Sequence, residues 1–153
     1  MYLCVIIDLF SRLVVGWSMA DHMRSELSVN ALRMAAFNRK LSIGVIIHSD
    51  KGSQYACKAF QDTAETFKFI SSMSGTGNCY DNAACESFFG TLKVDLCDDE
   101  NYKTVEQAKS SVFEYIESYY NRKRRHSTIN YKTPQQFEDI MKSVNQTCPK
   151  FAG

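Results

Sequence analysis

VIIHSDKGSQY, residues 45–55, decides how the chain is arranged: an apolar run ends in an aspartate, and Gly52 then permits a tight turn. The run Val45–His48 does not alternate between polar and apolar residues, which is typical of a central strand covered on both faces. Such a strand delivers Asp50 to its carboxyl end, where sheets flanked by helices place their ligands. We therefore expect Asp50 to be a functional residue at the edge of an α/β sheet.

A second acid lies in NCYDNAACESFFGTLK, residues 78–93, where Glu86 follows Asp50 with 35 residues between them. Glu86, Gly90 and Lys93 stand at positions i, i+4 and i+7, so they share one face of the expected helix. The neighbouring apolar face consists of Phe89, Leu92 and Leu96. Two-metal phosphoryl-transfer sites hold ions roughly 3.5–4 Å apart between carboxylates on different rigid elements. An aspartate at a strand end and a glutamate on a helix therefore predict a site for two Mg²⁺ or Mn²⁺ ions.

Three motifs carry a family resemblance. HSDKGSQY, GNCYDNAACESFF and YYNRKRRHSTINYKTPQQF resemble, in this order, the integrase-core transposases of bacterial insertion sequences, which are relatives of retroviral integrases. The resemblance runs from YLCVIIDLFSR to TPQQF, nearly the whole chain. It implies a ribonuclease H-like mixed sheet flanked by helices and an Asp, Asp, Glu triad with this last interval. It also implies metal-dependent DNA cleavage and strand transfer, with Asp50 and Glu86 as catalytic residues and metal ligands.

The first acid of the triad has no clear counterpart. Only two strand-like runs, Tyr2–Ile7 and Leu13–Met19, precede the first helical pattern, and the polar break between them predicts a hairpin. Family members open with three strands and carry the first aspartate on the first. The resemblance therefore implies that this strand lies upstream of Met1. Asp8 is the alternative first acid because it precedes Asp50, but the IDLFSR motif favours a turn residue that hydrogen-bonds the backbone.

Helical periodicity and turn residues predict the elements between these motifs. Ser25 can cap a helix that runs to about Asn38. A further helix opens at Ser53 or Gln54, and Phe67–Ile70 is a short strand.

The rest of the chain has clear start and stop signals. Residues 72–82 contain two glycines, serine and asparagine, which predicts a loop, and Asp81 or Asn82 can cap the Glu86 helix. Thr104 begins a capping box for a helix that ends before the basic run. Pro134 stands at the first position of a last short helix.

The composition indicates one soluble globular domain. The chain has 153 residues, of which 44% are hydrophobic and 23% charged. No apolar run approaches the roughly 20 residues that span a membrane, and Met1 leads into a strand rather than a signal peptide. We therefore expect a cytoplasmic protein without a membrane partner. Residues 1–143 are interpreted as the integrase core, truncated at its amino terminus, and residues 144–153 as a frayed tail.

Cysteine and histidine do not indicate a metal site. The six cysteines are scattered, and no CxxC pair or Cys/His cluster has the spacing of a zinc site. Reduced, structural thiols are the preferred interpretation.

Basic residues are unevenly distributed, although a net charge of +1 is low for a DNA-binding protein. Residues 122–126 read RKRRH. Such a run is often only a solvated helix end. Here HSTINYKTP follows it, as in the family's C-terminal signature, which favours contact with phosphate. The candidate DNA contacts are Arg122, Arg124, Arg125, Lys93, for which the family has a matching lysine, and Asn78 in the glycine-rich stretch.

Three functions stay open. The first is the catalytic core of a transposase that acts on transposon ends and target DNA. The second is a catalytically inactive remnant or regulator that binds DNA or a full-length partner. The third, a generic ribonuclease H-like nuclease, is disfavoured because GNCYDNA and RRHSTINYKTP are transposase motifs. We also expect a homo-oligomer, with end recognition supplied by a helix-turn-helix partner or a missing amino-terminal segment.

Overall fold

The computed structural model describes residues 1–39, 44–50, 52–73, 83–97 and 102–147. In chain order the elements are β1 (Tyr2–Ile7), β2 (Val14–Ala20), α1 (Ser25–Asn38), β3 (Ile46–Ser49), α2 (Ser53–Ala56), α3 (Lys58–Thr66), β4 (Ile70–Met73), α4 (Ala83–Leu92), the π-helix η2 (Lys93–Cys97), α5 (Val105–Glu114), the π-helix η3 (Tyr115–Tyr120), the 3₁₀-helix η4 (Ser127–Ile129) and α6 (Pro134–Thr147). Within these residues, no helix combines the length and the hydrophobicity needed to cross a membrane.

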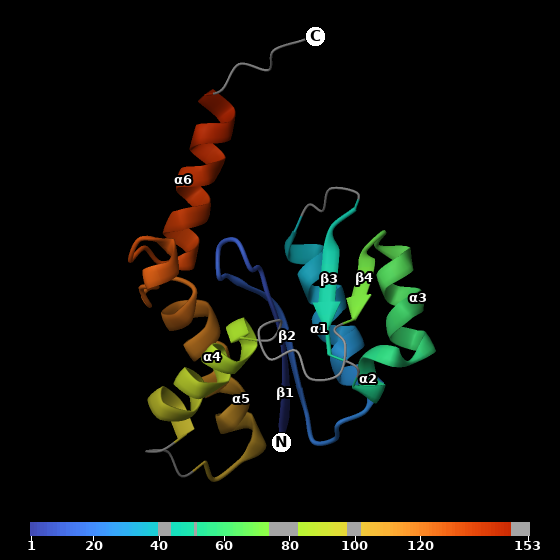
Figure 1. The fold of residues 1–153 in the computed structure, drawn as a ribbon. Coiled ribbons are helices and arrows are strands. Elements are labelled where there is room, and N and C mark those ends of the chain that lie inside the picture. Colours follow the sequence, from blue (N-terminus) through green and yellow to red (C-terminus); the bar gives the residue numbers. More distant parts are fainter. Residues whose placement is uncertain (40–43, 51, 74–82, 98–101, 148–153) are drawn as a thin grey trace.

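The strands form two separate two-stranded sheets (Figure 1). β1 and β2 are antiparallel, with Tyr2 opposite Ala20, whereas β3 and β4 are parallel, with Ile46 opposite Ile70. In Figure 1 β1 rises from the amino terminus while the arrow of β3 points down towards it, so β1 and β3 run in opposite directions. The expected fold class is correct, but the single mixed sheet is divided, because no described strand pairs between β1 and β3.

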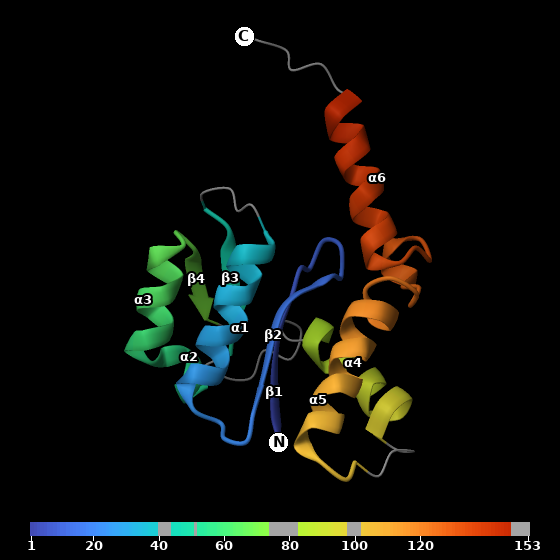
Figure 2. The same cartoon turned by 180° about the vertical axis from the view of Figure 1, so that it is seen from behind.

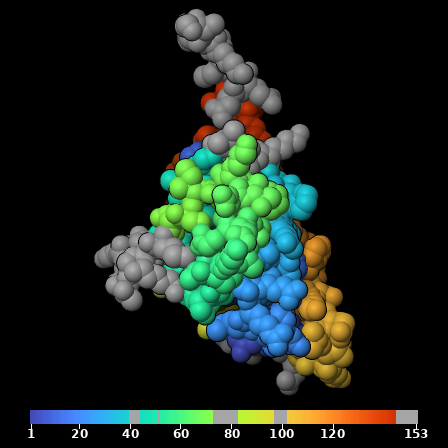
Figure 3. Space-filling model, turned by 90° about the vertical axis from the view of Figure 1, so that its right-hand side faces the viewer, coloured from blue at the N-terminus to red at the C-terminus, as the bar shows by residue number. Residues whose placement is uncertain are grey.

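Helix α1 joins the two sheets. It packs across β2 because Gly16 lets the helix approach: a Cβ at Gly16 would lie 2.6 Å from the backbone nitrogen of Ala35. Ala31 and Leu32 of α1 are fully buried. On the other side α1 contacts α3, and Figure 3 shows α3 in green beside the blue helix α1.

The other side of the β1–β2 hairpin is covered by α4, α5 and η3 (Figure 2). Phe88 of α4 is 1% exposed, and Ile116 of η3 is fully buried. The Phe88 ring packs edge to face against Tyr120, with 4.9 Å between centroids. This core fixes α4, and with it the face of α4 that carries Glu86.

Several sequence predictions are confirmed within one residue, among them the hairpin strands and the helix 25–38. Thr104 caps α5, since its hydroxyl accepts from the Gln107 N–H at 3.2 Å. Pro134 begins α6, but this helix is not short: it runs to Thr147.

Other predictions were wrong. The N-cap of α1 is Arg24 rather than Ser25. The strand predicted at Phe67–Ile70 is Ile70–Met73, because Lys68 adopts a left-handed turn with φ +58°. Ile46 is 65% exposed, so β3 is not covered on both faces as expected.

Candidate active site and nucleic-acid interface

Asp50 directly follows β3, at the carboxyl end of the strand as the sequence predicts, and it lines the groove described below. Its carboxylate is exposed, and one oxygen, Oδ1, accepts a hydrogen bond from the Gly52 N–H at 2.8 Å. This turn restrains the carboxylate while the other oxygen has no hydrogen bond to a described residue. Exposed carboxylate oxygens of this kind suit a hard cation such as Mg²⁺.

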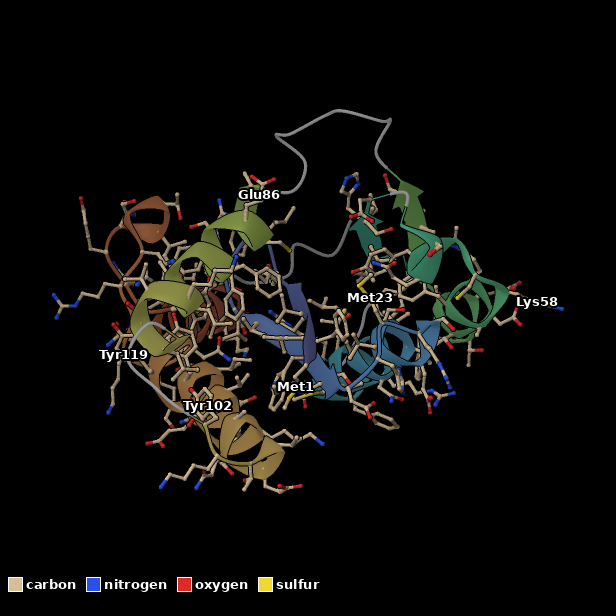
Figure 4. The ribbon with its side chains drawn as sticks, turned by 90° about the horizontal axis from the view of Figure 1, so that it is seen from below. Met1, Met23, Lys58, Glu86, Tyr102 and Tyr119 are labelled. Atoms are coloured by element: carbon tan, nitrogen blue, oxygen red, sulfur yellow. The ribbon has the colours of Figure 1, made fainter. Side chains whose placement is uncertain are left out.

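Glu86 stands in the first turn of α4, where the positive pole of the helix dipole favours a carboxylate. Figure 4 shows its side chain pointing away from Tyr102 and Tyr119. Phe88 and Leu92 on the opposite face are buried, which anchors the helix. Glu86 is therefore presented to solvent from a rigid element.

Cys85 connects the two acids. Its pKa is raised, first by burial and then by the negative charges of Asp50 and Glu86. Asp50 and Cys85 also line the same groove, described below, and Glu86 is the next residue after Cys85 in α4. The fold thus places the start of α4 on the groove that Asp50 lines, although Asp50 and Glu86 are 36 positions apart in the chain.

Asp8 is a turn residue, and this sequence interpretation is confirmed. Its Oδ1 accepts from the N–H groups of Phe10 and Ser11 at 2.8 and 3.1 Å. Its Oδ2 accepts from Arg39 at 2.8 Å. Asp8 follows the upper end of β1 in Figure 1, whereas Asp50 follows the lower end of β3, so the two acids lie at opposite ends of the sheets.

A groove of about 660 Å³ separates the two sheets. Its walls include the strands β1 and β3, and its floor and rim include Leu32, Phe60, Cys85 and Phe89. Both strands turn an unpaired backbone edge towards it, because β1 pairs only with β2 and β3 only with β4 among the described strands. The groove thus has strand edges on two sides, and its lining includes the charged residues Asp8, Arg39 and Asp50 beside the apolar ones.

The residues present fit part of a two-metal site. Asp50 and Glu86 offer the carboxylate oxygen ligands that Mg²⁺ prefers. No third His, Cys, Asp or Glu within the described ranges joins them in a group able to hold a metal ion.

The face of α4 beyond Glu86 is open. A Cβ built on Gly90 would meet no atom within 4 Å. Lys93 is exposed and begins the π-helix η2. Gly90 and Lys93 thus leave an unobstructed path along the helix from Glu86.

The basic run follows η3. Arg122 and Arg125 are exposed, whereas Arg124 is half-buried and lies 3.6 Å from the Asp95 carboxylate. Asn78 lies outside the described residues, as do Asp81 and Asn82. The sequence analysis did not single out Arg12, in the turn between β1 and β2, or Asn121, directly before the basic run. The sequence marks them only as members of the hairpin motif and the C-terminal motif.

Two family models match the chain. A model described as integrase core domain covers residues 1–79, and a second with the same description covers residues 86–141. The chain belongs to the integrase core family. Each of the two matched ranges contains one of the two candidate acids.

Curated relatives are transposases. The transposase for insertion sequence element IS904 of Lactococcus lactis subsp. lactis (strain IL1403) is 45% identical over 138 residues, which cover 90% of this chain and 54% of that protein. Transposase InsF for insertion sequence IS3A of Escherichia coli (strain K12) is 45% identical over 139 residues, 91% of this chain and 48% of that protein. The integrase core chain spans about half the length of the curated relatives it matches.

A solved structure shares the fold. A chain in the cryoEM structure of the simian T-cell lymphotropic virus intasome, in complex with PP2A regulatory subunit B56 gamma, matches with a TM-score of 0.69 and 19% identity. The match covers 99% of this integrase core chain and 50% of that chain. At this identity the likeness shows the ribonuclease H-like fold alone.

Proposed function

We propose that this chain is the part of a transposase core that carries the last two acids of the catalytic triad, and that it serves DNA transposition by metal-dependent strand cleavage and strand transfer. The observation that carries the proposal is that Asp50 and Cys85 line one groove, while Glu86, next to Cys85, stands exposed in the first turn of α4. The transposases 45% identical to this chain support the same reaction class.

We further propose that the first aspartate comes from a strand that fills the groove between β1 and β3. A strand there would pair antiparallel with β1 and parallel with β3, because β1 and β3 run in opposite directions (Figure 1). The six residues of β1 span about 20 Å at 3.3 Å per residue, so a strand of similar length would fit the edge. The relatives, about twice as long, have sequence from which such a strand could come.

The chain's own residues have distinct tasks in this scheme. Asp50 and Glu86 would hold Mg²⁺ or Mn²⁺, which supply activation of water or a 3′-hydroxyl and stabilise the charge of the transition state. Lys93 would bind a phosphate beside the reacting one, and Gly90 would leave room for the DNA backbone between them. Arg122, Arg124, Arg125 and Asn78 would bind backbone farther away. Oligomerisation and a helix-turn-helix partner or segment for end recognition belong to the same proposal.

The second candidate function is a DNA-binding remnant without catalysis. It is favoured by the two-acid cage, since no third acid joins Asp50 and Glu86 within the described ranges. On either reading the chain alone should bind Mg²⁺ weakly, because each octahedral shell lacks a strong anionic ligand. Tight, stoichiometric binding of two ions in calorimetry would contradict this.

The decisive experiment supplies a strand with an aspartate, fused ahead of Met1, and measures Mg²⁺-dependent cleavage of a labelled duplex. If the proposal is right, cleavage appears, and Asp50→Asn or Glu86→Gln abolishes it with little loss of DNA affinity. The matched control is Glu65→Gln, an exposed acid on α3 away from the groove. Cleavage that survives Glu86→Gln would show that the helix acid is wrongly assigned.

A further inference from the structure

The turn of the β1–β2 hairpin lies against the chain segment that follows η3. The buried side chain of Asn121 accepts a hydrogen bond from the Val14 N–H at 3.0 Å and donates one to the Val14 carbonyl at 3.1 Å. Arg12 is two residues before Val14, and Arg124 is three residues after Asn121. Figures 1 and 2 both show the tip of the blue hairpin beside the orange segment at the base of α6. The contact therefore gathers two arginines that are far apart in the sequence.

The position of Arg12 is fixed from several sides. Its N–H donates to the Asp8 carbonyl at 2.7 Å, and the adjacent Ser11 hydroxyl donates to Glu138 of α6 at 2.8 Å. Arg12 has a left-handed backbone with φ +64°. Glycine or asparagine would adopt this conformation at lower cost, on the order of 1 kcal/mol. A strained arginine at a rigid turn suggests that its side chain has a task.

Arg124 stands between Tyr120 and His126 in the chain, and the rings of these two residues pack with their centroids 5.0 Å apart. The pKa of His126 is lowered to about 4, first by burial and then by the positive charges of Arg124 and Arg12. The pKa of Tyr120 rises to about 12 through burial, and the same two guanidinium groups oppose that rise. Both charges thus act on the same two rings from two elements of the fold.

The cluster formed by Arg12, Arg124 and His126 has polar atoms and charges that are not fully paired. The buried atoms Arg124 Nε and His126 Nε2 have no hydrogen-bond partner within the described part of the chain. Among the described residues, Arg12 forms no ion pair, and Arg124 has one long contact, 3.6 Å from the Asp95 carboxylate. The two positive charges together thus have one described acid partner, so an anion that joins them would be attracted.

We infer that Arg12 and Arg124, with His126 beside them, form a site for one phosphate group of the DNA backbone. Planar guanidinium groups bind phosphate oxygens through paired N–H donors, which suits two arginines that converge from different elements. The inference rests on the proposed function because it takes DNA as the ligand. It adds a contact from the hairpin, an element to which no DNA role was assigned.

The test uses Arg12→Asn in the full chain, since asparagine removes the charge but tolerates the left-handed backbone. Binding of a short duplex is measured at several salt concentrations between about 50 and 200 mM. One lost phosphate contact should reduce the salt slope by about 0.9, so that a fourfold rise in salt weakens the variant about 3.5-fold less than the parent. The melting temperature should stay equal or rise, because the backbone strain is relieved. Lys109→Gln, an exposed lysine on α5, is the matched control and should change the slope little.

A second measurement follows the His126 ring by NMR with chloride, with inorganic phosphate at equal ionic strength, and with the duplex. The duplex should raise the His126 pKa in the parent and not in Arg12→Asn. If inorganic phosphate raises it equally while Arg12→Asn leaves the DNA salt slope unchanged, the site takes free phosphate and the DNA assignment is overturned. If the salt slope of DNA binding is unchanged in Arg12→Asn but reduced in Arg122→Gln, this phosphate site is rejected while the proposed function stands. A parent chain without salt-dependent DNA binding would reject the proposed function as well.

Discussion

Replacing Asn121 by alanine tests the contact that holds the two halves of the basic region together. Asn121 is 5% exposed and forms hydrogen bonds with both backbone polar groups of Val14, which is itself 4% exposed. Alanine would leave a buried N–H and a buried carbonyl without partners, at about 1–3 kcal/mol each. The expected loss is about 2–6 kcal/mol of unfolding free energy, or roughly 4–24 °C in melting temperature for a chain of this size.

Asn38→Ala is the matched control. Asn38 also bonds β2, but it is exposed and donates a single hydrogen bond, to the Val15 carbonyl at 3.0 Å. Its loss should cost about 0.5–1.5 kcal/mol. Both variants are compared with the parent by urea and thermal unfolding followed by circular dichroism. A loss in Asn121→Ala no greater than in Asn38→Ala would refute the reasoning, because the buried pair would then contribute no more than a surface bond.

Asn121→Ala also has an expected effect on DNA binding. If Arg12 and Arg124 share one phosphate, loosening the contact between their elements should reduce the salt slope even though no charge is removed. Measured at a temperature where the variant remains folded, a slope equal to the parent's would show that the two arginines act separately.

Three further predictions follow from the fold and the site. Gly16→Ala should destabilise the protein by about 1–3 kcal/mol through overpacking against α1. Gly90→Ala should stabilise α4 by about 0.5–1 kcal/mol yet slow cleavage in the protein to which the strand has been added. Equal shifts of the melting temperature in the two variants would contradict both expectations. Because the folded-state pKa of His126 is depressed, to about 4, its neutral form stabilises the fold above the unfolded value of about 6.5, and this contribution is lost as the pH falls from about 6.5 towards 4; urea unfolding across that range should show the loss, and His126→Gln should weaken it. Neutralising Lys93 in the restored enzyme should reduce single-turnover cleavage more than affinity, while neutralising Arg122 should do the reverse, and equal effects of both changes would mean one continuous surface.

Much of the fold could be predicted from the sequence because its helices and strands arise from local residue patterns. The hairpin strands and the helix 25–38 follow from alternation and helical periodicity, and Thr104 caps its helix through a bond three residues along. The strand near residue 70 was displaced because Lys68 takes a left-handed turn that a lysine does not signal. The end of α6 was missed because no glycine or proline marks it before Thr147.

The candidate site, like the fold, could be predicted from the sequence only in part. The positions of Asp50 and Glu86 at a strand end and in a helix's first turn could be predicted from the motifs around them. The approach of Arg12 to Arg124 could not, because it depends on Asn121 bonding a strand 107 residues away. Tertiary contacts of that kind leave no periodicity in the sequence.

The arrangement of the two sheets links completion of the fold to completion of the site. Asp50 belongs to the β3–β4 sheet and Glu86 to the helix packed on the β1–β2 hairpin, and the groove lies between these two parts. A strand bonded to both edges would therefore fix the separation of the two carboxylates while it adds the third. Within the described residues, α1 contacts both parts, and α4 packs on the hairpin through the core around Phe88. We therefore expect stability and metal affinity to rise together when the strand is supplied, and a strand whose aspartate is replaced by asparagine to restore the first without the second.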